Sequence, residues 1–219
     1  MAGIKPRERV NRTWSPELSY AIGLLATDGC LSGDGRHLEL TSKDRDQLRN
    51  FLRCLGIKNK ITEKLSGYSK KFYPRVQFGD VVFYRFLIEI GLTPAKSKTL
   101  GRLDIPPKYF FDFLRGSFDG DGTFYSYWDP RWKSSFMFYT VFISASRAHI
   151  DWIRECLFEH IKVKGHITHD GRKITHQLKY AKQESLKILR KMYYDPDVVC
   201  LKRKRLKVER TLRIIGAEL

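Results

Sequence analysis

Two aspartates, Asp28 and Asp121, occupy matching places in the chain and are the residues best suited to carry out chemistry. Each ends a mostly apolar, helix-length run, SYAIGLLATDGCL at 19–31 and FLRGSFDGDGTF at 113–124, and each is followed by glycine. A carboxylate at the C-terminal end of a helix faces the negative end of the helix dipole, and two such carboxylates would also repel each other. A hard divalent cation would neutralise both, because such cations prefer oxygen ligands. The pair therefore predicts a metal-dependent site suited to phosphodiester hydrolysis.

Two glycines predict how these aspartates could meet. Gly23 lies five positions before Asp28, and Gly116 lies five positions before Asp121. Glycine inside a helix costs about 1 kcal/mol relative to alanine, so its presence at both places needs a reason. A helix face without a side chain lets another backbone approach closely. We therefore predict that the two motif helices pack against each other at these glycines, with both aspartates side by side at the helix ends.

The two motifs belong to a tandem repeat. They are followed, in the same order, by corresponding segments, of which the closest pairs are KNKIT at 58–62 with KGHIT at 164–168, and AKSKTL at 95–100 with LKRKRL at 201–206. Internal repetition of this kind indicates a supersecondary unit that is used twice. We expect a basic N-terminal extension at 1–14, a first half at 15–105 and a second half at 106–219.

Each half predicts the element order α-β-β-α-β-β-α. Ser15 is a favourable N-cap for the first motif helix, and Pro106 and Pro107 suit the start of the second. Apolar spacing marks later helices around 48–55, 81–90, 150–157 and 183–192, and turn signals separate the strands between them. The sequence therefore predicts an α+β fold with two antiparallel, saddle-shaped sheets around a two-helix interface.

The amino-acid composition limits the classes of function that the protein can have. The 41 basic residues outnumber the 24 acidic residues, which gives a net charge of +17 and predicts a polyanionic partner, most often nucleic acid. A ribosome-associated or merely basic protein is the alternative. No apolar stretch is long enough to span a membrane, and no secretion signal is visible, so we expect a soluble, intracellular protein of unknown compartment. The four cysteines are far apart, which predicts free thiols and excludes a zinc ribbon.

Strand alternation separates an apolar face from a polar, basic and aromatic face in each half. Val76 and Phe78 are expected to face the helices, as are Ile174, Leu178 and Tyr180. The opposite face is expected to contact double-stranded DNA, although any antiparallel sheet can have a solvated face. The predicted contacts are Ser32, Arg36, His37, Glu39, Thr41, Lys60, Thr62, Lys64, Lys70, Lys71, Tyr73, Arg75, Gln77, Thr123, Tyr125, Tyr127, Arg131, Lys133, Tyr139, His166, Thr168, Arg172, Lys173, Thr175, Gln177 and Lys179.

The two motifs resemble a known family. AIGLLATDG and LRGSFDGDG are similar to the two signature motifs of a single-chain LAGLIDADG homing endonuclease, and the resemblance extends through both halves of the repeat. The first motif departs from the pattern, because Ala26 stands where the family usually has an acidic residue, whereas Asp119 fills that place in the second half. The later acid, which the family needs for activity, is intact in both motifs.

The resemblance implies a metal site. Asp28 and Asp121 would bind Mg²⁺, or another divalent cation such as Mn²⁺, and would activate water at the two scissile phosphates. The neighbouring Gly29 and Gly122 belong to the same predicted metal site.

The resemblance also implies basic residues near each scissile phosphate. Lys96 and Lys202, the first lysines of AKSK and LKRK, fit best by position, with ordinary phosphate contact as the alternative role. Lys43 matches a further family position. The second half has Ala145 there, so the two half-sites are expected to be unequal.

The implied function is a metal-dependent double-strand cut in a long asymmetric DNA duplex, made by a monomer that acts as a pseudo-dimer. The gene would lie in an intron or be a free-standing mobile element. Two alternatives use the same scaffold, namely an RNA-binding intron maturase and a non-catalytic DNA-binding regulator. A regulator should have lost at least one motif acid, but Asp28 and Asp121 are both present. A metal-independent RNA-binding protein leaves the paired aspartates unexplained.

Overall fold

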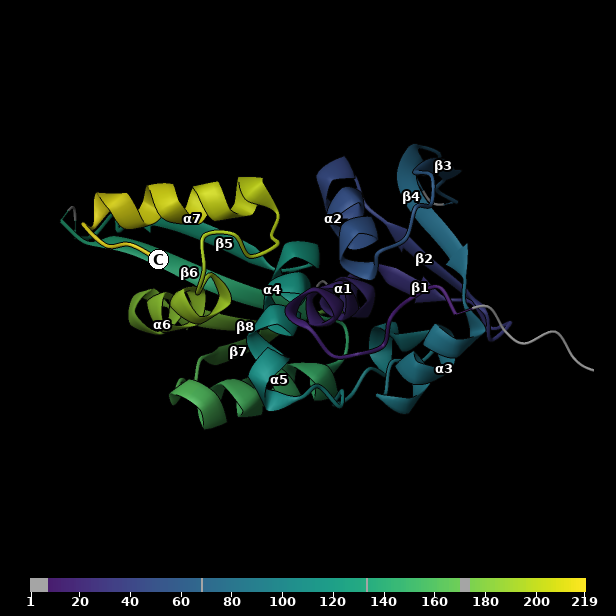
Figure 1. Ribbon diagram of the computed structural model, residues 1–219. Helices are drawn as coiled ribbons and strands as arrows, with labels where there is room; N and C mark the ends of the chain where they lie inside the picture. Colours follow the sequence, from purple (N-terminus) through teal and green to yellow (C-terminus); the bar gives the residue numbers. More distant parts are fainter. Residues whose placement is uncertain (1–7, 68, 133, 170–173) are drawn as a thin grey trace, which may run out of the picture.

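The computed structural model describes residues 8–67, 69–132, 134–169 and 174–219, which form two similar halves (Figure 1). The first half consists of α1 (Pro16–Thr27), β1 (Gly29–Leu31), β2 (His37–Thr41), α2 (Arg45–Leu55), β3 (Thr62–Leu65), β4 (Phe72–Gly79), α3 (Val81–Glu89) and the 3₁₀ turn η1 (Lys96–Lys98). The second half consists of the 3₁₀ turn η2 (Pro107–Tyr109), α4 (Phe110–Gly120), β5 (Thr123–Trp128), β6 (Phe136–Ser144), α5 (Arg147–Ile161), β7 (His166–His169), β8 (His176–Ala181), α6 (Lys182–Met192) and α7 (Lys202–Ile214). None of the described helices is long and apolar enough to cross a membrane.

The two sheets have the same topology. The first has the strand order β1-β2-β4-β3 and the second has β5-β6-β8-β7, with every neighbouring pair antiparallel. The predicted fold class is therefore confirmed, including the repeated element order and the two antiparallel sheets. The helix α7 was not predicted, and it lies over β5 and β6 in the second half (Figure 1).

Local signals explain where the helices begin and end. The Ser15 Oγ accepts a hydrogen bond of 3.1 Å from the Leu18 backbone N–H, and proline occupies the first turn of α1. The side chain of Asp44 caps α2, which ends at Gly56 in the left-handed conformation (φ 64°). The carboxylate of Asp80 caps α3 by accepting a bond from the Phe83 N–H.

The segment before α1, at residues 9–14, contacts the rest of the first half. The second oxygen of Asp80 accepts hydrogen bonds from the backbone N–H groups of Arg9 and Val10, at 2.8 and 3.1 Å. Val10 is buried, and the ring of Trp14 makes an edge contact with Phe86 at 5.6 Å. Val10 and Trp14 therefore pack into the first half's core, whereas residues 1–7 of the predicted extension lie outside the described residues.

The strand faces follow the predicted alternation with one exception. Val76, Phe78, Leu178 and Tyr180 are buried under the helices. Ile174 is 65% exposed, contrary to the prediction, because it lies before β8, which begins only at His176. The apolar face of this strand is therefore shorter than its sequence suggested.

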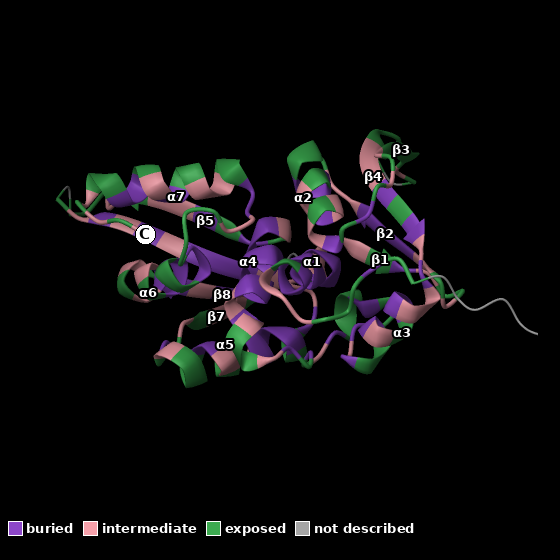
Figure 2. Cartoon of the chain, in the orientation of Figure 1, coloured by how far each residue is buried: buried purple, intermediate pink, exposed green. Residues whose placement is uncertain are grey.

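The helices α1 and α4 lie side by side at the centre of the molecule, where both are largely buried (Figure 2). A Cβ atom built on Gly23 would lie 2.2 Å from the Phe113 carbonyl oxygen, and one on Gly116 would lie 2.1 Å from the Tyr20 carbonyl oxygen. Real Cβ atoms do not approach oxygen this closely, so only glycine permits this helix–helix distance. The structure thus places both glycines in the interface between the halves.

We expect Gly23→Ala to destabilise the protein by at least about 2 kcal/mol, because the added methyl group must push two backbones apart. Gly33→Ala is the matched control, since a Cβ at Gly33 would meet no atom within 4 Å, and its effect should stay within about 0.5 kcal/mol. Urea unfolding of both variants and the parental protein measures the difference. Equal stability of the two variants would show that the helices do not touch at this point.

His149 fixes the segment between the halves against α5. Its Nδ1 lies 2.9 Å from the Gly101 carbonyl oxygen, and the neighbouring Ser146 hydroxyl donates to the Leu100 carbonyl at 2.5 Å. The imidazole is buried and its Nε2 has no hydrogen-bond partner in the described residues. Burial lowers the pKa of His149 to about 4, so the ring is neutral at pH 7 and donates through Nδ1–H.

The buried His149 should make stability depend on pH. The unfolded chain protonates this ring below its ordinary pKa of 6.5, whereas the folded protein does so only near 4, so stability is lost as the pH falls through this window. By about pH 4, this pKa difference lowers the free energy of unfolding by about 3 kcal/mol. Urea unfolding of the parental protein and of His149→Gln should show a smaller pH dependence in the variant. The same slope in both would exclude a neutral, buried His149.

Candidate functional site

Asp28 and Asp121 are the C-terminal caps of α1 and α4. The backbone N–H of Asp28 donates to the Leu24 carbonyl at 3.0 Å, and that of Asp121 donates to the Ser117 carbonyl at 3.2 Å. Because α1 and α4 abut, both carboxylates lie at the same end of the helix pair. Burial, followed by the charge of Asp121, raises the pKa of Asp28 to about 6. Loss of hydration also raises the pKa of Asp121, although its side chain keeps contact with solvent.

Each aspartate is accompanied by a lysine from the end of its own half. Lys96, in η1, is buried, and its Nζ donates to the Gly29 carbonyl oxygen. Lys204, in the first turn of α7, donates to the carbonyl oxygens of Gly122 at 2.6 Å, Phe118 at 2.5 Å and Gly120 at 3.3 Å. In both halves, therefore, a lysine amine lies against the carbonyl group of the glycine that follows the aspartate.

Burial sets the charge behaviour of these lysines. It lowers the pKa of Lys204 to about 8, while the nearby carboxylates, led by Asp119, act in the opposite direction. Burial also lowers the pKa of Lys96, and the charges of Asp121 and Asp28 are among those that oppose the shift. The site thus brings two carboxylates and two amines under mutual electrostatic influence.

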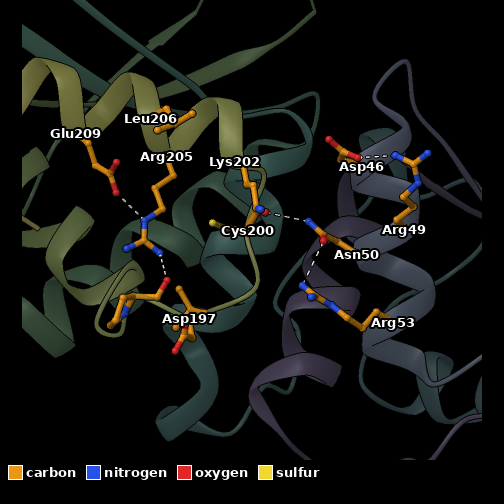
Figure 3. A pocket seen from close by; sticks show the side chains of 12 residues that line it. Asp46, Arg49, Asn50, Arg53, Asp197, Cys200, Lys202, Arg205, Leu206 and Glu209 are labelled. Carbon is orange, nitrogen blue, oxygen red and sulfur yellow. Dashed lines mark hydrogen bonds and ion pairs between the residues drawn. The ribbon is translucent and has the colours of Figure 1, made fainter.

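The structure places Lys204 at the carboxylates in the position that the sequence assigned to Lys202. Lys202 is exposed and lines a pocket between α2 and α7, where Asn50 donates to the Cys200 carbonyl at 2.9 Å (Figure 3). Residues two positions apart in an α-helix lie on nearly opposite sides, so only one of these lysines can face inward. The predicted alignment of AKSK with LKRK was therefore two residues out of phase.

Gln47 is a site residue that sequence reasoning missed. Its Nε2 donates to the Asp28 Oδ2 at 2.8 Å, and its side chain is buried in the inward stripe of α2 beside Leu48. A glutamine among apolar residues of an amphipathic helix was the available signal, since a buried amide needs a polar partner. Lys43, the residue that the sequence favoured nearby, is exposed, and its Nζ lies 5.6 Å from the centre of the Tyr73 ring.

Asp119 anchors the start of α7. Its carboxylate is fully buried and accepts hydrogen bonds from the Tyr20 hydroxyl at 2.8 Å and from the Leu201 N–H at 2.7 Å. Burial raises the pKa of Asp119 to about 6. Because Leu201 precedes α7, this carboxylate fixes the helix phase that turns Lys204 toward Asp121. Ala26 holds the corresponding place in the first half, where no such helix follows.

The donor set suits a hard cation. Asp28 and Asp121 offer carboxylate oxygens, and the carbonyl groups of Gly29 and Gly122 lie beside them but accept bonds from lysines. Mg²⁺ is commonly held by one or two carboxylates together with water and substrate phosphate, so two carboxylates suffice. The described residues contain no cluster of three or more histidine, cysteine or acidic side chains that could hold a metal.

An ion-pair cluster occupies the polar face of the first sheet. The Lys64 Nζ lies 2.5 Å from Glu39 Oε1, and Arg75 Nη1 lies 2.7 Å from Glu39 Oε2. Glu39 is buried by these partners, so its carboxylate orients two cations and has little surface left for DNA. Its predicted direct contact with DNA is therefore replaced by a supporting role, while Lys64 and Arg75 remain accessible.

Stacked tyrosines lie on the second sheet, across β5 and β6. The rings of Tyr125 and Tyr139 lie 5.2 Å apart, and Tyr127 lies 6.2 Å from Tyr139, with all rings nearly parallel. Cross-strand pairing sets this geometry, because Tyr125 is directly opposite Tyr139 in the register. The two halves therefore present different chemistry on equivalent surfaces.

The other predicted DNA contacts lie at accessible positions. Apart from Glu39, all those in the described ranges are at least partly exposed, in the strands or in the connecting turns. Arg131 is paired with Asp129 in the turn between β5 and β6. Three predicted contacts, Lys133, Arg172 and Lys173, lie outside the described residues.

Comparisons with known proteins support one fold. Residues 15–91 match the family model described as a LAGLIDADG-like domain. No curated protein is significantly similar in sequence to this chain.

Three solved structures resemble nearly the whole chain. Full-length DUF199/WhiA from Thermatoga maritima is 17% identical with a TM-score of 0.57, and the match covers 97% of this chain but only 66% of that one. The homing endonuclease I-WcaI, bound to its DNA recognition sequence, is 13% identical with a TM-score of 0.57, covering 94% and 95% of the two chains. Meganuclease I-SmaMI, bound to uncleaveable DNA, is 11% identical with a TM-score of 0.58, covering 92% of each. Because the identities are so low, these matches show a shared fold alone.

We expect Lys204 to titrate near pH 8, because burial disfavours its charged form. The side-chain signals of lysine in a ¹³C NMR pH titration measure this, and Lys204→Met should remove the signal with the lowered midpoint. Lys202→Met is the matched control on the same helical turn and should leave that signal in place. Loss of this signal in Lys202→Met would show that Lys202, and not Lys204, is the lysine that faces inward.

Proposed function

Because the chain has the LAGLIDADG fold and its first half matches the LAGLIDADG-like domain model, we propose that it is a site-specific DNA endonuclease. It makes a metal-dependent double-strand cut in a long asymmetric duplex. The observation that carries this proposal is the placement of Asp28 and Asp121 at abutting helix ends, each with its own lysine. Structural packing alone does not call for two carboxylates at that point, since they repel each other.

The polar faces of the two sheets are the proposed DNA surface. The two sheets lie on either side of the α1/α4 pair (Figure 1), so a duplex lying across both polar faces would pass over the carboxylates at the helix ends. Lys64 and Arg75 supply positive charge in the first half, and the tyrosine stack supplies aromatic contact in the second. The similar structures of I-WcaI and I-SmaMI hold DNA, which supports the same partner here. One chain supplies both halves, so we propose a monomer.

Asp28 and Asp121 would hold the divalent cation, for which we propose Mg²⁺ or Mn²⁺. When bound, the metal supplies a more acidic water and neutralises negative charge on the phosphate. Hydrolysis forms one bond between phosphorus and the water oxygen and breaks one phosphorus–oxygen ester bond, and the leaving oxygen takes up a proton. The amines of Lys96 and Lys204 lie beside the carboxylates and would stabilise charge that develops on the phosphate oxygens.

A second candidate is nucleic-acid binding without cutting. The likeness to DUF199/WhiA, which extends over 97% of this chain, favours it. An RNA-binding maturase would use the same scaffold and could keep both acids. The presence of both motif aspartates favours the endonuclease, and cleavage itself separates the two functions.

We expect Asp28→Asn and Asp121→Asn each to slow cutting by at least about 100-fold, because charge stabilisation is lost at the reacting phosphate. Neither change should weaken DNA binding, since each removes a negative charge from a DNA-facing site. Selection of cleaved duplexes from a randomised library with Mg²⁺, and of bound duplexes with Ca²⁺, supplies the target and both readouts.

Two lysine variants sharpen this test. Lys204→Met should lose cutting, whereas Lys202→Met should retain it, because only the Lys204 amine lies against the Gly122 carbonyl group, next to Asp121. Binding should also fall steeply with added salt, since contacts to phosphates release counterions. If the parental protein binds duplex DNA but never cuts it, the binding function is established instead. If Asp28→Asn and Asp121→Asn cut at the parental rate, these two aspartates are excluded from catalysis.

A further inference from the structure

The two carboxylates at the centre of the site are held differently. The Asp28 Oδ2 accepts a hydrogen bond of 2.8 Å from the Gln47 amide, which comes from α2 of the same half. In the described parts of the chain, the Asp121 carboxylate accepts no side-chain hydrogen bond at all. Lys204 instead donates to main-chain carbonyls on either side of it. One carboxylate is therefore held by a directed bond, and the other has no such bond within the described residues.

The Gln47 amide is itself firmly oriented. The side chain is 2% exposed, and the Ser42 hydroxyl lies 3.2 Å from its Oε1 as a donor. The same hydroxyl oxygen accepts a bond of 3.1 Å from the Asp44 N–H. Since the hydroxyl proton is directed to Oε1, the amide must present its Nε2 to Asp28.

The beginning of α2 is tied to the opposite half. The carboxylate of Asp44, which caps α2, pairs with the Arg203 guanidinium at 2.8 Å, and Arg203 belongs to α7. Nearly two turns further on, Asn50 donates to the Cys200 carbonyl. These two contacts fix α2 relative to the second half, and so fix the position from which Gln47 reaches Asp28.

The second half lacks this arrangement although its backbone is equivalent. SKDRDQ at 42–47 corresponds to SASRAH at 144–149, and the first serine of each accepts a bond of 3.1 Å from the N–H two residues on. This correspondence places His149 where the first half has Gln47. His149 is directed to the Gly101 carbonyl, among aromatic rings, and so makes no contact with Asp121.

We propose that Gln47 is a positioning residue that fixes the Asp28 carboxylate and thereby makes the two strands of the target differ in cleavage rate. This inference rests on the proposed endonuclease function. The strand served by Asp28 meets a carboxylate that is already oriented, whereas the strand served by Asp121 must wait for its carboxylate to be ordered. Pre-orientation of this kind raises the rate without adding a contact to the substrate.

A strand-resolved assay tests the proposal. Each strand of the selected duplex carries a different dye, and single-turnover rates are measured with Mg²⁺ for both strands. In the parental protein one strand should be cut faster. Gln47→Leu should slow that strand by at least about 10-fold, as is typical for the loss of an outer partner of a metal-binding group, and should slow the other strand far less. Ser42→Ala removes the donor that orients the Gln47 amide, together with the acceptor of the Asp44 N–H, and leaves the amide itself in place, so it should move the ratio in the same direction by a smaller amount.

Gln183→Leu is the matched control. It makes the same side-chain change at an exposed position of α6, beside Lys187 and Leu219, so it should leave the ratio of strand rates unchanged. A second readout does not depend on cutting. The Gln47 side-chain amide signal in NMR spectra, identified by its absence in Gln47→Leu, should shift in Asp28→Asn and stay in place in Asp121→Asn.

The outcomes separate the inference from the function on which it rests. If the parental protein cuts but Gln47→Leu keeps the parental ratio, or slows both strands equally, the inference is wrong and the endonuclease assignment stands. An amide signal that does not respond to Asp28→Asn also overturns it. If the parental protein cuts neither strand, the proposed function fails and the inference fails with it.

Discussion

The close contact between the backbones of α1 and α4 is the constraint on which the rest of the structure depends. Gly23 and Gly116 permit it, because any Cβ at either position would overlap a carbonyl oxygen of the facing helix. The contact fixes the two helix ends relative to each other, and the aspartates that cap those ends are thereby fixed as well. Both sheets then extend outward from one shared core.

Bringing two carboxylates together at negative helix ends is unfavourable, and the structure offsets this with buried amines. Each half supplies one lysine from the segment that follows its last repeated helix, Lys96 from η1 and Lys204 from α7. Their contacts with main-chain carbonyls keep these amines in place whether or not a cation is bound. Fixed charges of both signs thus surround the position where a phosphate would lie, and they need no rearrangement when it arrives.

The two halves of the repeat have the same strand topology, but their side chains differ in chemistry. Gln47 serves Asp28 only in the first half, whereas Asp119 and α7 position a lysine only in the second. The polar faces differ likewise, with a Glu39-centred ion-pair cluster on one sheet and stacked tyrosines on the other. A single chain can diverge in this way because a substitution in one half is not copied into the other, which suits an asymmetric partner.

The sequence by itself determined the repeat, the element order, the paired aspartates and the glycine contact, because caps, apolar periodicity and helix-interior glycines act over a few residues. It did not determine the inward lysine, which depends on the phase of α7 and hence on the hydrogen bond from Leu201 to Asp119, 82 positions away. It also did not reveal Gln47 at Asp28, or Glu39 held between Lys64 and Arg75, since these contacts arise from helix docking and strand register. Only tertiary structure decides which polar groups meet, because neither spacing nor residue type encodes distance between separate elements.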